Sequence, residues 1–239
     1  MFATTPRCGS HFVCSNLYQT FRAGLPLEYL NPAHWASWQE RAGTTSHWNT
    51  LSYLVSRRTS GNGVFSIKMH WSHLSALPTE KLHTWFRGSQ WVRIERADVV
   101  GQAVSWEIAA QTGSFIYTQP AWQTPKFNFD GIYSKLMQVL EQKEQWRQYF
   151  EKNGVSPHVV IHEQFISDPA KETKALIKAL GLPRAVGARR PDIPIVESQH
   201  SSINSEWSER FVHMLSQRSD ENSLEQKSAN SALLSGIAR

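Results

Sequence analysis

Residues 2–24, FATTPRCGSHFVCSNLYQTFRAG, contain the pattern that decides the fold. Phe2 to Thr5 predicts a short β-strand, and the segment Pro6-Arg7-Cys8-Gly9 predicts a turn after it. Ser10 is a suitable N-cap for a helix that ends at Gly24, because apolar residues at 12, 17 and 21 approximate helical spacing. A strand, a glycine-containing turn and a helix in direct succession are typical of an α/β protein.

The same alternation of strand and helix continues along the chain. Strands are expected at 64–68, 91–95 and 159–162, and helices at 32–58 (one or two), 98–112, 130–152 and 168–180. The helix that Asp130 is expected to cap has four inward-facing apolar residues, namely Ile132, Leu136, Leu140 and Phe150. We therefore predict an α/β fold with a P-loop-like, doubly wound parallel sheet flanked by helices. Ligands of such sheets bind beyond the carboxyl ends of the strands, and the segment 113–129 is a candidate substrate lid.

Length and composition fit one globular domain. The 239 residues are 40% apolar and 19% charged, which excludes wholesale disorder, collagen and coiled coil. We place the domain at 1–215 and a disordered tail at 216–239, because the tail is rich in Ser, Asn and charge. The net charge of +5 suggests an anionic ligand more than nucleic acid, since no long basic run concentrates it.

Two cysteines, Cys8 and Cys14, exclude a disulfide scaffold and a cysteine-built zinc site. The scattered histidines show no metal-ligand spacing, so no metal is predicted. The sequence also lacks a recognisable secretory signal and an apolar run long enough to span a bilayer, and a cytoplasmic location is expected.

The turn at Arg7 to His11 is a candidate anion site. Amides at the start of a helix point outward, where the helix dipole favours an anion, and Gly9 lets an oxygen approach the backbone closely. Arg7 adds a permanent charge with a planar set of donors. An ordinary strand-to-helix turn with an incidental arginine explains the same residues equally well. The Walker A pattern G-x-x-x-x-G-K-[ST] is absent, which disfavours a kinase or an ATPase.

A second candidate anion site is RADVVGQAVS, residues 96–105. Arg96 ends a predicted strand and Ser105 lies in the following helix, so both are placed to bind a phosphate over the helix start. Taken alone, the residues favour a simpler explanation, in which Arg96 pairs with Asp98 and Ser105 bonds to its own helical turn.

Several ordered motifs resemble the trehalose-sulfotransferase family. PRCGSH followed by GLPLEYL is similar to that family's P-R-S-G-S-T … G-x-P-x-E-[FY]-[FL], and NGVFSIKMHWSHL is similar to N-G-V-[FW]-G-x-K-x-x-W-x-Q-L. The block QAVS within residues 96–112 is the most specific match. The matches extend over about residues 4–211.

The resemblance implies a sulfotransferase that uses 3′-phosphoadenosine 5′-phosphosulfate as donor and a hydroxyl of a carbohydrate or glycolipid as acceptor. It implies that Arg96 and Ser105 bind the 3′-phosphate, and that the 5′-phosphosulfate is bound by Arg7, Cys8, Gly9, Ser10 and His11. Members of the family are known as dimers, so a homodimer is possible. Cys8 and His11 replace a serine and a threonine of the usual motif, and the loss of the threonine hydroxyl leaves open a catalytically impaired nucleotide-binding or partner protein.

Two residues compete for the role of general base. Glu28 stands at the position of the family's catalytic carboxylate. His70 belongs to Lys68-Met69-His70, which is similar to the K-x-H of cytosolic sulfotransferases, where the histidine is the base. Strand alternation places Lys68 and His70 on one face, and Lys68 is a candidate for neutralising charge on the leaving oxygen.

Overall fold

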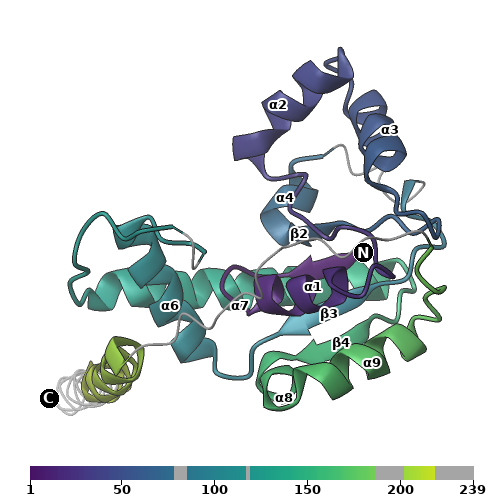
Figure 1. Cartoon of the computed structure of the whole chain (residues 1–239). Coiled ribbons are helices and arrows are strands. Elements are labelled where there is room, and N and C mark those ends of the chain that lie inside the picture. The colour runs from purple at the N-terminus through teal and green to yellow at the C-terminus, as the bar shows by residue number, and fades with distance from the viewer. Residues whose placement is uncertain (78–84, 117–118, 187–201, 219–239) are drawn as a thin grey trace, which may run out of the picture.

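The computed structural model describes residues 1–77, 85–116, 119–186 and 202–218. Its centre is a parallel sheet with the strand order β2-β1-β3-β4. The strands are β1 (Phe2–Thr4), β2 (Lys68–His70), β3 (Val92–Glu95) and β4 (His158–Ile161). The register pairs Thr4 with His70 and Phe2 with Val92. The prediction of a doubly wound parallel sheet is confirmed (Figure 1).

The second strand begins later than expected. The segment 64–68 was predicted as a strand, but β2 begins only at Lys68. Just before it, Ile67 forms an isolated parallel bridge with Leu27, and the Leu27 carbonyl accepts from the Lys68 amide at 3.0 Å. The chain around Leu27 therefore runs beside the start of β2, which brings Glu28 to the carboxyl end of the sheet.

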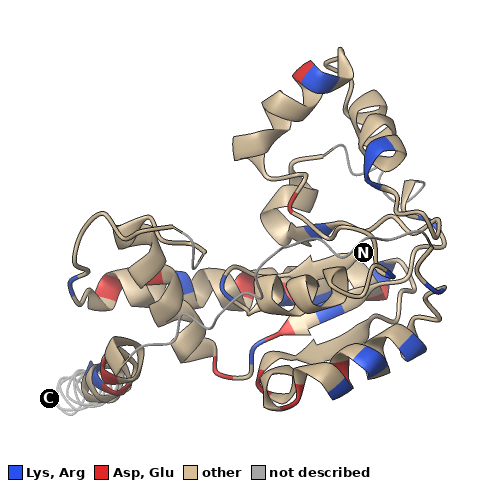
Figure 2. Cartoon of the chain, viewed as in Figure 1, with Lys and Arg blue, Asp and Glu red and all other residues tan. Residues whose placement is uncertain are grey.

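Helices cover both faces of the sheet because the strand residues alternate between two apolar clusters. One face packs α1 (Ser10–Tyr18), α8 (His162–Ser167) and α9 (Pro169–Ala179) against Phe2, Val92 and Ile94. The opposite face packs α7 (Phe129–Lys152) and α4 (Trp71–Ser75) against the sheet. Charges of both signs lie along α7 and α9 (Figure 2).

The long helix α7 differs from its prediction at two points. Its N-cap is Asn128, whose side chain accepts from the Gly131 amide, so Asp130 lies in the first turn and does not cap the helix. Leu140 is 43% exposed, whereas its neighbour Val139 is fully buried. The inward row along 132, 136, 139, 146 and 150 follows the 3.6-residue period, which leaves position 140 pointing to solvent.

Two further parts extend from this core. The helices α2 (Pro32–Ala42) and α3 (His47–Arg58) form a hairpin that projects from the sheet (Figure 1), and α2 has no buried residue. On the other side, α6 (Val99–Thr112) and α7 pack against a helix at 202–218 through a third apolar cluster. This last helix crosses the expected domain boundary at 215, and the rest of the expected tail lies outside the described residues. Within the described part of the chain, no helix combines the length and the apolar character needed to cross a membrane.

Candidate active site

The loop after β1 forms the centre of the site at the carboxyl edge of the sheet. Arg7 and Gly9 both adopt positive φ, at 62° and 82°. Gly9, not Ser10 as expected, is the N-cap of α1, and no side chain of the described residues caps this helix. The first amides of a helix have no carbonyl partner within it, and the helix dipole makes this end attractive to anions. These features are compatible with the anion site that the sequence predicts at this turn.

Two polar nitrogens at the ends of the neighbouring strands are buried without a hydrogen-bond partner among the described residues. They are Nε of Arg96, after β3, and Nδ1 of His162, after β4. The His162 ring packs directly on Gly9, where a Cβ atom would lie 2.1 Å from Nδ1. Burial, followed by the charge of Arg96, lowers the pKa of His162. Sequence reasoning did not assign His162 to the site, because no spacing relates it to the loop.

A buried glutamine fixes the loop to α6. Nε2 of Gln102 donates to both Thr5 Oγ1 and the Pro6 carbonyl oxygen, each at 2.7 Å, and the residue is fully buried. Because both amide hydrogens are used on consecutive residues, the backbone just before Arg7 is held in place. Gln102 belongs to the QAVS block, so the motif contained the signal, but no role was assigned to this residue.

The structure brings Arg7 and Ser105 together. Nε of Arg7 donates to Oγ of Ser105 at 3.0 Å, and its guanidinium also donates to the Phe115 carbonyl oxygen. Burial, and then the nearby charge of Arg96, lowers the pKa of Arg7 to about 10. The two residues that the resemblance places at opposite ends of one nucleotide are therefore direct partners.

Arg96 has acidic neighbours. Its guanidinium lies 3.1 Å from Oδ2 of Asp98, as the simpler interpretation of its sequence expected, and 3.9 Å from Oε1 of Glu163. Glu163 also accepts from the amides of Ala97 and Asp98. These hydrogen bonds and ion pairs join the start of α6 to the residues just after β4, and they hold Arg96 beside the loop.

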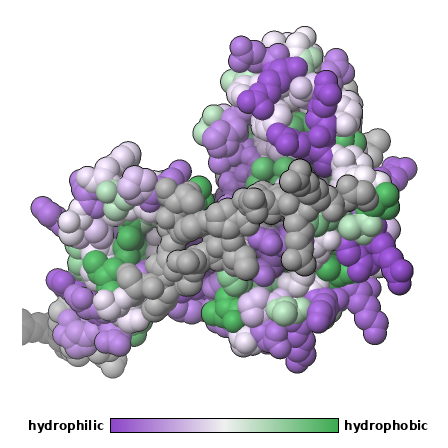
Figure 3. Space-filling view, viewed as in Figure 1, coloured by the Kyte–Doolittle hydropathy of each residue, from purple (hydrophilic) through white to green (hydrophobic). Residues whose placement is uncertain are grey.

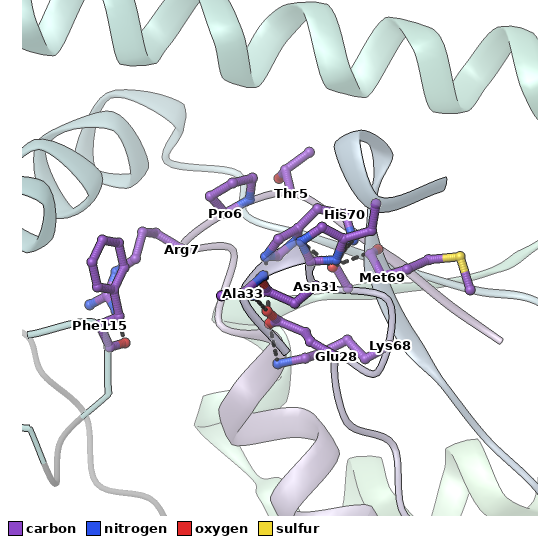
Figure 4. Close-up of polar contacts among 12 residues, drawn as sticks. Thr5, Pro6, Arg7, Glu28, Asn31, Ala33, Lys68, Met69, His70 and Phe115 are labelled. Atoms are coloured by element: carbon purple, nitrogen blue, oxygen red, sulfur yellow. Dashed lines mark hydrogen bonds and ion pairs between the residues drawn. The ribbon is translucent and has the colours of Figure 1, made fainter. Parts of the chain in front are cut away.

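Glu28 is the centre of a second group of side chains at the end of β2 (Figure 4). Its Oε1 lies 2.9 Å from Nζ of the buried Lys68 and 3.5 Å from Nε2 of His70, while Oε2 accepts from Asn31 at 3.3 Å. Burial alone would raise the pKa of Glu28, but the charge and hydrogen bond of Lys68 together with the nearby His70 and His73 outweigh burial and hold this pKa well below its ordinary value. Burial lowers the pKa of His70 to about 4, so its ring is neutral at pH 7.

Hydrogen bonds around the His70 ring make opposite demands on Nδ1. The His70 ring accepts from the His73 amide, and Nδ1 of His73 accepts from the His70 amide at 3.3 Å. The Thr4 hydroxyl donates its single hydrogen to the Met69 carbonyl oxygen at 2.9 Å, so at 2.8 Å from Nδ1 of His70 it acts as an acceptor. Both neutral tautomers of His70 therefore have a main-chain or side-chain partner, and the Lys68 ammonium is the N–H donor to Glu28.

Comparison with known proteins places these features in a family. A sequence model described as Stf0 sulphotransferase matches residues 1–213. The chain belongs to the Stf0 sulphotransferase family. Membership confirms the resemblance that the motifs carried, and it makes the chain a transferase whose family implies a sulfated-nucleotide donor and a carbohydrate acceptor. A search of curated proteins found no match.

Three side chains in this sulfotransferase site are of types that can bind a metal ion. Ligand atoms of Glu28, His70 and His73 lie within 4.8 Å of one another. Carboxylate and imidazole bind zinc, but here the Lys68 ammonium already neutralises the carboxylate and both imidazoles accept main-chain amides. The absence of a metal stays a prediction. His73 was missed by sequence reasoning, although its position three residues after His70 places both on one helical turn.

The loop after β1 also borders a hollow of about 270 Å³. It lies beside α6, and its lining consists of Arg7, Ser105, Ile108, Ala109, Thr112, Ser114, Ala121, Pro125, Ile203 and Asn204. Three of these residues, Ser114, Ala121 and Pro125, belong to the segment 113–129, whose role as a substrate lid stays a prediction.

The buried histidines predict that acid destabilises the protein. Unfolded His70 takes up a proton near pH 6.5 but folded His70 only near pH 4, so stability present above pH 6.5 is lost as the pH falls between these values. We expect His70 to account for a loss of about 2 kcal/mol in unfolding free energy between pH 7 and pH 5. Urea denaturation at both pH values measures it, with His70→Gln expected to reduce the loss. An unchanged loss in the variant would contradict the assignment. His11, whose pKa burial and the Lys68 charge lower to about 4, adds in the same direction.

Proposed function

We propose that the chain transfers the sulfuryl group of 3′-phosphoadenosine 5′-phosphosulfate to a hydroxyl of a carbohydrate or glycolipid, with Glu28 as general base. The observation that carries the proposal is the arrangement around Glu28. The Lys68 ammonium presents N–H groups to Oε1 of Glu28 and keeps the carboxylate charged, so its lone pairs are available for a new proton. Of its two oxygens, Oε2 has the single long contact with Asn31 and is the better placed to accept.

The residues around the loop fit an anionic nucleotide donor. The N-terminus of α1 has no side-chain cap, and Arg96 Nε and His162 Nδ1 are buried beside the loop without hydrogen-bond partners among the described residues. Such groups are costly to bury unless a ligand satisfies them. Gly9 to His11 and Arg7 would hold the 5′-phosphosulfate, and Arg96 would hold the 3′-phosphate. When bound, the donor supplies an activated sulfuryl group.

The chain's own residues then provide orientation and a proton acceptor. Glu28 accepts the proton of the acceptor hydroxyl at Oε2 as the oxygen–sulfur bond forms. Its low pKa makes it a weak base, but the hydroxyl becomes acidic as its oxygen bonds to sulfur, so the proton moves late. Lys68 and His70 fix the carboxylate. Arg7 and the loop amides place positive charge where the leaving phosphate gains negative charge.

Binding of the reaction's nucleotide product tests the donor site directly. Adenosine 3′,5′-bisphosphate is expected to raise the melting temperature more than 5′-AMP at equal concentration, because Arg96 binds the additional phosphate. Differential scanning fluorimetry measures both shifts. In the control variant Arg96→Met, the advantage of the bisphosphate is expected to disappear while the 5′-AMP shift remains. Equal shifts for the two nucleotides on the unmodified chain would contradict the proposed donor.

A further inference from the structure

The walls of the hollow beside Arg7 are mainly aliphatic. Its walls include Ile108, Ala109, Pro125 and Ile203, and Arg7 is the single charged residue of the described lining. Hydrophobic side chains gather in the lobe that contains it (Figure 3).

Several polar side chains of the lining are engaged within the protein. The Thr112 hydroxyl donates to the Ile108 carbonyl oxygen at 2.8 Å, and Ser114 Oγ donates to the Gln119 carbonyl oxygen at 2.7 Å. The Ser105 hydroxyl oxygen accepts from Arg7. A sugar ring needs many donors and acceptors to replace its bound water, so a lining with aliphatic walls and hydroxyls used in this way suits an apolar group better.

From this lining we infer that the hollow binds an apolar segment of the acceptor, such as an alkyl chain attached to a sugar. The inference rests on the proposed function and makes its acceptor a glycolipid type. A volume of about 270 Å³ is below that of sites for whole drug-sized ligands, so it suits one part of a larger molecule. Burial of each methylene group of an alkyl chain is favourable, so even a short chain adds affinity.

The hollow adjoins the proposed donor site through Arg7 and Ser105 but extends away from it. Arg96 and His162, the buried groups that suit the donor, are not part of its lining, and the described lining has no aromatic ring on which a base could stack. Arg7 belongs to both the hollow and the loop, and Figure 4 shows it between Phe115 on one side and Glu28, Lys68 and His70 on the other. When the alkyl chain of an acceptor lies in the hollow, its sugar end therefore lies past Arg7, towards the loop.

Calorimetric titration with two probes tests the inference. In the presence of adenosine 3′,5′-bisphosphate, n-octyl β-D-glucopyranoside, kept below its micelle concentration, is expected to bind at least tenfold more tightly than D-glucose. The variant Ala109→Leu, which fills the hollow from α6, is expected to remove this advantage. Its control is Ala110→Leu, the next residue of the same helix, which is exposed and outside the lining.

A second variant covers the case in which Ala109→Leu does not fold. Ala121 is exposed at the hollow, so Ala121→Glu introduces a charge there with little risk to the core, and Ala110→Glu is its control. Equal binding of both probes, or octyl glucoside binding that neither hollow variant weakens, would overturn the inference. It would also be overturned if these variants weakened binding of the bisphosphate. The proposed function fails separately, when the bisphosphate has no advantage over 5′-AMP.

Discussion

Replacing Glu28 by glutamine is expected to lower kcat for sulfation about 1000-fold, the typical contribution of a general base. Glutamine keeps the shape of the side chain but cannot accept the proton of the acceptor hydroxyl. The measurement is mass-spectrometric detection of sulfated products after incubation of the protein with the donor and a cell extract, with product followed over time.

The matched variant for this prediction is His70→Gln. Its amide group can take the place of Nε2 beside Glu28, but it cannot take up a proton. If Glu28 is the base, this variant keeps most of the activity, within about tenfold, since it retains a polar group beside the carboxylate. A loss as large as that of Glu28→Gln would instead make His70 the base.

Folding must be checked in this experiment because Glu28→Gln leaves the buried Lys68 without its ion-pair partner. Loss of one member of a buried pair destabilises a protein strongly. Glu28→Asp keeps the charge but withdraws it from the acceptor, so a folded but slow Glu28→Asp variant supports the same role. Adenosine 3′,5′-bisphosphate binding, measured by the melting temperature, shows whether each variant retains its nucleotide site.

The second large effect is expected from Gly9→Ala, which should abolish nucleotide binding and lower the free energy of unfolding by more than 2 kcal/mol. An alanine at φ 82° is strained by about 1–2 kcal/mol, and its Cβ would overlap the His162 ring at 2.1 Å. To relieve this contact the buried His162 ring or the loop at the start of α1 must move, and either shift disturbs the proposed nucleotide site. Chemical denaturation and the response to adenosine 3′,5′-bisphosphate measure the two effects.

Gly43→Ala is the control, because Gly43 also has a positive φ, 63°, but nothing lies within 4 Å of its added Cβ. It should show the strain alone and leave nucleotide binding unchanged. The double variant Gly9→Ala with His162→Ala should recover part of the stability lost by Gly9→Ala. Equal destabilisation by Gly9→Ala and Gly43→Ala would show that the His162 contact does not matter.

The sequence predicted the sheet and most helices because their signals are local. Asp168-Pro169 starts α9 and Asp98 caps α6 as expected, since capping depends on neighbouring residues. Period-2 alternation also predicted correctly that Lys68 and His70 share a face, and both lie beside Glu28. The prediction that Leu140 faces inward was wrong because a spacing of four residues drifts off the buried face over several turns.

The parts of the site that could not be predicted depend on contacts between distant elements. Pairing of Arg7 with Ser105 joins residues 98 positions apart, and the Gln102 bonds span 96 and 97 positions. A long flexible guanidinium has several partners within reach, so only the packed structure selects one. The contact of His162 with Gly9 likewise arises only when β4 takes its place in the sheet.

The dependence of the loop on Gln102 has a consequence for the order in which the site forms during synthesis. Thr5 and Pro6 leave the ribosome long before Gln102, which bonds to both of them. The hydrogen bond from Trp146 Nε1 to the Thr4 carbonyl oxygen can form only later still. A nascent chain that ends before α6 lacks the amide that holds this turn. The nucleotide-binding end of the enzyme should therefore become competent only after its downstream half has emerged.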